Sequence, residues 1–133
     1  MAGETRVRVA HESDIVAARR EGRALAQTLG FSSGELAVIA TAISEVARNI
    51  IAYASRGEVL LAIVEAGSRR GLRVVARDEG PGIADIALAM QDGWSTSRGL
   101  GLGLPGARRL MDDFEVQSSS RGTTVTMTKW ARR

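Results

Sequence analysis

The chain has 133 residues, the size of one compact domain, so we expect a single domain over residues 1–133. It contains no cysteine, which excludes disulfides, thiolate metal sites and cysteine nucleophiles. The net charge is +3, but the arginines are scattered and no aromatic residues alternate with them, so we expect no nucleic-acid partner. We recognise neither an apolar run of membrane-spanning length nor a signal peptide, which predicts a cytoplasmic protein without membrane contact.

The first half of the chain predicts one strand followed by two helices. Residues 5–10 alternate between apolar and arginine side chains, as in a half-buried strand. Residues 13–29 follow as a helix with one apolar face, capped by its first two residues. Ser32 and Glu35 match the capping-box pattern and open the longest helix, which runs to about residue 54.

The second half predicts two strand pairs separated by glycine-rich sequence and a helix. The expected elements are strands at 58–66 and 72–78, a short helical segment at 83–90, a flexible loop at 92–98, a helix at 100–112 and strands at 114–119 and 123–130. Pro105 fits the last helix only if it lies in the first turn. This order of elements indicates an α+β fold, a two-layer sandwich with helices on one face of a sheet.

Two polar residues of the longest helix are candidates for chemistry. Glu45 and Asn49 are four residues apart, so their side chains share one face of the helix. An acid beside an amide oxygen suits a hydrated Mg²⁺ ion, or a general base next to a metal-bound phosphate. Taken alone, the pair is more typical of an ordinary solvated helix face than of a metal site or a general base.

Two glycine-rich stretches suggest a nucleotide site. Asp78 ends a predicted strand and is followed by Gly80 and Gly82, which leaves a carboxylate beside backbone that a ligand can approach closely, although a simple turn gives the same pattern. Three alternate glycines then precede a helix, at residues 99, 101 and 103, where free N–H groups and the helix dipole favour phosphate. Their spacing matches neither the Rossmann nor the P-loop fingerprint.

The order of these patterns resembles a known superfamily. Glu-x-x-x-Asn on a helix, Asp-x-Gly-x-Gly after a strand, a glycine-rich lid and the late Gly122-Thr123 are similar to the four boxes of the GHKL ATPase/kinase superfamily, from about Phe31 to Lys129. Residues 99–106 and 109–112 resemble the small anti-sigma serine kinases, in particular the stressosome switch kinases. The resemblance implies a GHKL fold with a mixed, largely antiparallel sheet.

The resemblance also implies ATP and Mg²⁺ as cofactors and a role for each candidate residue. Asn49 would be the metal ligand and Glu45 the general base on the attacking hydroxyl. The adenine end would be formed by Asp78, which binds the exocyclic amine, by Gly80 and Gly82, which let the base approach, and by Thr123.

At the phosphate end, the resemblance implies that Gly99, Gly101 and Gly103 bind the phosphates. Arg98 lies beside this glycine run, and a guanidinium there would steady the γ-phosphate, although an exposed lid arginine gives the same sequence.

By the same resemblance, the protein is a serine/threonine kinase that phosphorylates STAS-domain proteins of the RsbS and RsbR kind in a stressosome. Once released, it would activate a phosphatase of the RsbU kind. The alternative is an anti-sigma factor that chiefly sequesters a sigma factor and phosphorylates only its STAS antagonist. The only histidine, His11, has no dimerising helical hairpin ahead of it, so we do not expect histidine autophosphorylation. A homodimer remains open.

Overall fold

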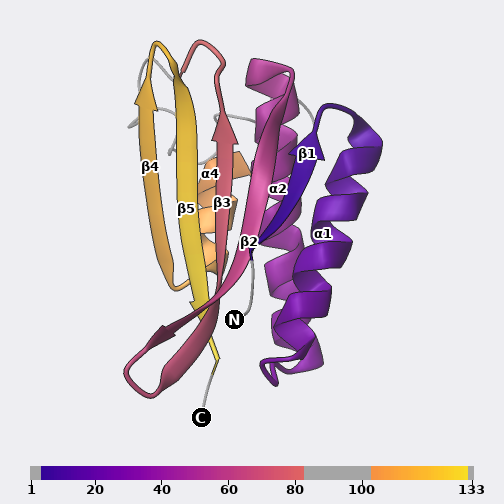
Figure 1. The fold of residues 1–133 in the computed structure, drawn as a ribbon, viewed down its shortest axis with the longest axis vertical. Helices are drawn as coiled ribbons and strands as arrows, with labels where there is room; N and C mark the ends of the chain where they lie inside the picture. The colour runs from indigo at the N-terminus through magenta and orange to yellow at the C-terminus, as the bar shows by residue number, and fades with distance from the viewer. Residues whose placement is uncertain (1–3, 83–102, 132–133) are drawn as a thin grey trace.

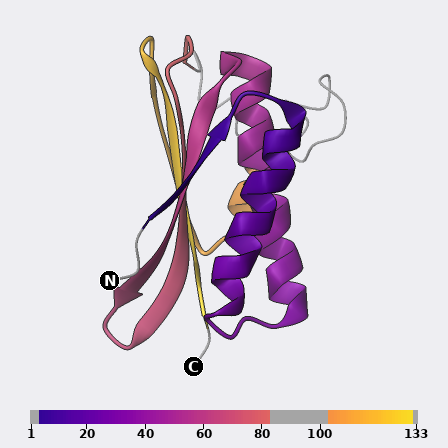
Figure 2. The ribbon, with the colours of Figure 1, turned by 45° about the vertical axis from the view of Figure 1, so that its right-hand side comes forward.

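The structure is a computed structural model that describes residues 4–82 and 103–131. Its elements are β1 (Thr5–Val9), α1 (Glu12–Gln27), α2 (Ser33–Ala54), β2 (Gly57–Ala66), β3 (Arg69–Asp78), α4 (Gly103–Leu110), β4 (Asp113–Ser119) and β5 (Gly122–Trp130). The strands form one sheet in the order β1-β2-β3-β5-β4. The helices cover one face of this sheet and leave the other open (Figures 1 and 2), which confirms the two-layer α+β sandwich.

The described strands differ from the expected sheet in one respect, because all their pairings are antiparallel and none gives the mixed character. Two of these pairings come from hairpins of two residues, Gly67-Ser68 and Ser120-Arg121, and so short a loop joins antiparallel strands only. Gly67 has φ of +61°, so the first turn is tighter than predicted and both of its strands extend further.

The helix starts confirm one capping prediction and correct another. Ser32 Oγ accepts the Glu35 N–H at 3.1 Å and Glu35 Oε1 accepts the Ser32 N–H at 3.0 Å, so α2 opens with the predicted capping box. Helix α1 begins earlier than predicted, with His11 as its N-cap. The Asp14 carboxylate still caps this end, because its Oδ2 accepts the N–H groups of Ala10 and His11, both at 2.9 Å.

Helix α4 ends at Leu110, two residues before the predicted end, and Pro105 lies in its first turn as required. The predicted segments at 83–90 and 92–98, and the predicted start of this helix at residues 100–102, lie outside the described residues.

The core lies between α2 and the sheet. The apolar stripe of α2 is fully buried against β2, β3 and β5, through residues that include Ile39, Ile43, Ile50, Leu61, Val74 and Met127. Helix α1 crosses α2 closely at Gly22, where a Cβ atom would collide with the Ile43 side chain. This packing holds α2 in place and leaves its polar face for α4.

By length and composition α2 could span a membrane, so the prediction that no apolar run reaches that length is wrong for this helix. However, 56% of its most apolar window is buried inside the fold, as in the core helix of a soluble domain.

Candidate nucleotide-binding site

The first half of the candidate site lies where β3 ends. Asp78 is the last residue of β3 and stands opposite Thr123 on β5. Its Oδ1 atom accepts the N–H of Gly80 at 2.9 Å and the N–H of Thr123 at 3.3 Å. Within the described residues, Oδ2 forms no hydrogen bond. The backbone therefore fixes the carboxylate through one oxygen and leaves the other available to a donor such as an exocyclic amine.

Thr123 is held by a neighbour that the sequence analysis missed. Its side chain is 4% exposed, and its hydroxyl lies 2.8 Å from the Ser118 hydroxyl on β4. The two residues are paired across the β4–β5 hairpin, so counting outward from a two-residue turn would have found Ser118. This hydroxyl pair places polar atoms directly beside Asp78.

The two glycines after Asp78 have a packing reason of their own. A Cβ at Gly80 would lie 2.6 Å from Ala54 Cβ at the end of α2. Gly82 has φ of +85°, and a Cβ there would collide with the Ser119 carbonyl oxygen. The loop therefore passes between α2 and the β4–β5 hairpin with no room for a side chain at these two positions, which accounts for both glycines with or without a ligand.

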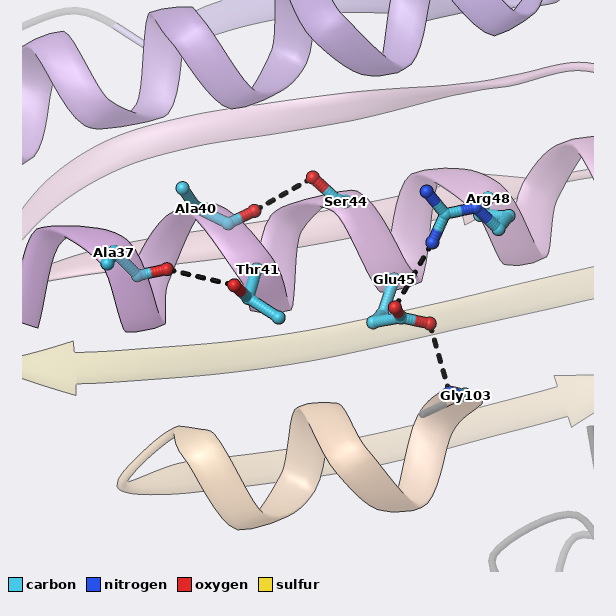
Figure 3. A network of polar contacts seen from close by, with 7 residues as sticks. All are labelled: Ala37, Ala40, Thr41, Ser44, Glu45, Arg48 and Gly103. Atoms are coloured by element: carbon cyan, nitrogen blue, oxygen red, sulfur yellow. Dashed lines mark hydrogen bonds and ion pairs between the residues drawn. The ribbon is translucent and has the colours of Figure 1, made fainter. Parts of the chain in front are cut away.

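The second half of the site lies between α2 and α4. Glu45 is only 8% exposed, so a solvated helix face is the wrong interpretation for this residue. Its Oε1 atom accepts the N–H of Gly103, the first residue of α4, at 3.0 Å, and its Oε2 atom pairs with Arg48 Nη1 at 3.1 Å (Figure 3). A carboxylate of α2 therefore occupies the free N–H at the start of α4, where the helix dipole favours an anion.

Asn49 lies one helical turn beyond Glu45 and is half-buried. Among the described residues its side chain forms no hydrogen bond, so its amide oxygen can ligate a hard cation together with water.

The structure therefore brings the predicted residues together in two groups: Glu45 with Gly103, and Asp78 with Gly80 and Thr123. Arg98, Gly99 and Gly101 lie outside the described residues, and their predicted roles stay predictions. The sequence analysis missed Arg48, although its spacing of three residues from Glu45 is typical of a helical ion pair.

Comparison with known proteins agrees with this geometry. Residues 9–129 match the histidine kinase-like ATPase domain family. The fold also resembles one third of a crystal structure of the RsbU and RsbW domains of a Mycobacterium tuberculosis protein, which aligns with a TM-score of 0.67 at 20% identity, over 98% of this chain and 33% of that chain. A fold and site of this kind define an ATP-using domain.

Two relatives show which kind of ATP-using protein this chain resembles. The chain is 50% identical to the serine/threonine-protein kinase RsbT of Bacillus subtilis over 127 residues, which are 95% of this chain and 96% of the relative. It is 34% identical to an anti-sigma F factor of a Thermoanaerobacter species, over 85% of this chain and 82% of the relative. The chain belongs to the histidine kinase-like ATPase family, and within it to the serine/threonine-protein kinases related to RsbT.

Proposed function

We propose that this protein is a serine/threonine kinase that transfers the γ-phosphoryl group of Mg-ATP to a STAS-domain protein. The observation that carries the proposal is the buried Glu45 carboxylate, held at the N-terminus of α4 by the Gly103 N–H. Asn49 lies one turn away on the same helix, and Asp78 at the end of β3 has a carboxylate oxygen without a hydrogen bond among the described residues. These three residues would supply the base, the metal ligand and the adenine anchor.

The chemical step needs a base and a charged clamp on the phosphates. In this proposal Glu45 takes the proton from the substrate hydroxyl, whose oxygen forms a bond to the γ-phosphorus. The bond between the γ-phosphorus and the bridging oxygen breaks, and ADP leaves with that oxygen. Mg²⁺, when bound through Asn49, neutralises charge on the phosphates. Arg98 is proposed to stabilise the transferred group.

The Gly103 contact links phosphate binding to the base. One N–H group is the donor for Glu45, and the same N–H belongs to the glycine run proposed for the phosphates. A phosphate oxygen that takes this N–H would displace Glu45 Oε1, which then becomes available to accept a proton while Oε2 stays paired with Arg48. Glu45 would therefore act as a base only when the nucleotide is in place.

The partners and the location complete the proposal. The relative named RsbT supports a serine/threonine kinase. From the resemblance to the stressosome switch kinases we propose STAS-domain substrates of the RsbS and RsbR kind, held in a stressosome, and an RsbU-type phosphatase activated after release. We place this cycle in the cytoplasm. The relative named anti-sigma F factor supports the alternative, a protein that chiefly sequesters a sigma factor. The higher identity to RsbT favours the switch kinase.

The test is phosphate transfer from radiolabelled ATP to a purified RsbS-type protein, with and without Mg²⁺. We expect the wild type to label a serine or threonine, and Glu45→Ala and Asn49→Ala to fail while they stay folded. Thr41→Ala is the matched control, because Thr41 lies one turn before Glu45 and, among the described residues, its hydroxyl bonds only to the Ala37 carbonyl (Figure 3). Full labelling by Glu45→Ala, or capture of a sigma factor without labelling, would contradict the proposal.

A further inference from the structure

A concave surface lies at the end of the sheet where β3 finishes. It is a pocket of about 880 Å³, and among its described lining residues Asp78 is the only one predicted for the nucleotide site. The pocket is lined by five arginines, which come from β1, the α2–β2 connection, β3 and the β4–β5 turn: Arg6, Arg8, Arg56, Arg77 and Arg121. We call this surface the arginine pocket.

Strand register explains why Arg8 and Arg77 share a face of the sheet with Glu58 and Thr124. Arg8 pairs with Glu58, Glu58 with Arg77, and Arg77 with Thr124, so one row of the sheet carries all four side chains. The residues next to them in sequence, such as Val9 and Ala76, are buried under the helices. Side chains alternate between faces along a strand, so the arginine row lies on the face opposite the core.

One carboxylate of the lining, Glu58, is paired with these arginines. Glu58 Oε2 accepts hydrogen bonds from Arg77 Nε at 2.9 Å and Nη2 at 2.5 Å, and Arg6 Nε lies 3.3 Å from Oε1. The hydrogen bonds from Arg77 and the charges of the surrounding arginines hold the pKa of Glu58 below its ordinary value. The pocket therefore stabilises a carboxylate in its charged form.

The described lining carries five arginines and three acids, Glu58, Asp78 and Glu79, so two positive charges are in excess. Arg8, Arg56 and Arg121 are exposed, and none forms an ion pair within the described part of the chain. Like charges that line one pocket repel one another, so the arrangement favours an anionic occupant.

The lining also indicates what kind of anion fits. Among the described residues, the lining includes the small apolar residues Ala10 and Ala54 but no aromatic ring on which a base could stack. Guanidinium groups match carboxylates in planar two-point contacts, as the Arg77 contact with Glu58 illustrates. An acidic segment of a polypeptide carries both carboxylates and aliphatic groups. Such a segment therefore matches this lining better than a nucleotide does.

We propose that the arginine pocket binds an acidic segment of a partner protein. The segment would place its carboxylates against Arg8, Arg56 and Arg121. This proposal goes beyond the kinase function and does not depend on it, because these arginines take no part in the nucleotide site, with which the pocket shares only Asp78 among the described residues.

The test measures binding of a fluorescein-labelled decaglutamate peptide by fluorescence anisotropy. Arg8→Ala with Arg121→Ala should weaken binding about fivefold, since exposed charge pairs contribute modestly and neither arginine holds Glu58. Glu58→Gln should strengthen binding by roughly twofold to threefold, because it frees Arg6 and Arg77. The matched control is Arg19→Ala with Arg23→Ala, which removes the same charge from the exposed face of α1 and should change nothing. Thermal unfolding checks that every variant is folded.

Each alternative has its own outcome. Equal weakening by the α1 control would mean attraction by net charge alone and would overturn the proposal. Binding of inorganic tripolyphosphate or a ten-residue thymidine oligonucleotide through Arg8 and Arg121, without binding of the peptide, would assign the pocket to a small anion or a nucleic acid. Self-association in sedimentation velocity that the Arg8 and Arg121 variant abolishes would assign it to a second copy of this chain.

Discussion

The most direct test of the adenine end is the substitution Asp78→Asn. Oδ1 of Asp78 accepts two backbone N–H groups, so an amide at this position keeps its oxygen there and places its NH₂ where Oδ2 lies. A donor then faces the exocyclic amine of adenine, which is also a donor. Losing a hydrogen bond to a charged acceptor costs about 1.5–3 kcal/mol, which corresponds to roughly 10- to 150-fold weaker ATP binding.

The fold should survive this change. Both backbone hydrogen bonds keep an acceptor and lose only its charge, so we expect destabilisation of about 1 kcal/mol and a fall in Tm of roughly 4 °C. Titration calorimetry with ATP and ITP reads out the base contact, because ITP carries a carbonyl where ATP carries the amine. We expect the variant to prefer ITP. A folded variant that binds ATP within twofold of the wild type would refute the role assigned to Asp78.

Two further predictions concern the acids of α2 and α1. Glu45→Gln keeps an acceptor for the Gly103 N–H but removes the Arg48 ion pair and the base. Phosphate transfer should therefore fall by roughly 10²–10⁴-fold. The free energy of unfolding, measured in denaturant, should fall by only about 1 kcal/mol. Transfer within threefold of the wild type would exclude Glu45 as the base. N–H groups of Ala10 and His11 hold the pKa of Asp14 below its ordinary value, so the stability lost in Asp14→Asn should be constant above about pH 5. That difference should shrink as the pH falls through the folded pKa, and a loss independent of pH from 2 to 7 would contradict it.

Local patterns in the sequence predicted the elements and the adenine end. Apolar periodicity and the Ser32–Glu35 pair located α2, and the acid at the end of a strand located Asp78. These features depend on neighbours within a few residues, which a sequence displays directly. The cap of α1 was predicted less well, because Asp14 caps from inside the helix rather than from its start.

Contacts between distant segments were the part that the sequence could not supply. The Glu45 pattern alone favoured a solvated face, but Gly103, 58 residues further along the chain, covers this carboxylate. The arginine pocket is a similar case, because its residues come from four separate segments and meet only through the register of the sheet. Scattered arginines in a sequence can therefore form one concentrated surface in the fold.

The direction in which the Asp78 side chain points depends on that same strand register. Glycines on both neighbouring strands allow the close packing that maintains this register at the end of β3. A Cβ at Gly57 on β2 would lie 2.5 Å from the Arg77 carbonyl oxygen and 2.9 Å from Ile50 Cγ2. A Cβ at Gly122 on β5 would collide with the Asp78 carbonyl oxygen. The backbone of residues 77–78 is thus held closely by both neighbouring strands. A shift of one residue would exchange the faces of Arg77 and Asp78, removing the acid from the nucleotide site and an arginine from the pocket.

A comparison of two single variants, Gly57→Ala and Gly71→Ala, separates the orientation of Asp78 from general destabilisation. At the opposite end of β3, a Cβ at Gly71 would lie 2.7 Å from the Lys129 carbonyl oxygen, so each substitution forces backbone apart and should cost about 1–3 kcal/mol. We expect Gly57→Ala to weaken ATP binding at least tenfold at a temperature where both variants are folded, since it moves the backbone that carries Asp78. Gly71→Ala should bind ATP as the wild type does. If the two variants are equally destabilised and bind ATP with equal affinity, the close packing around the end of β3 supports the fold alone and does not orient the Asp78 carboxylate.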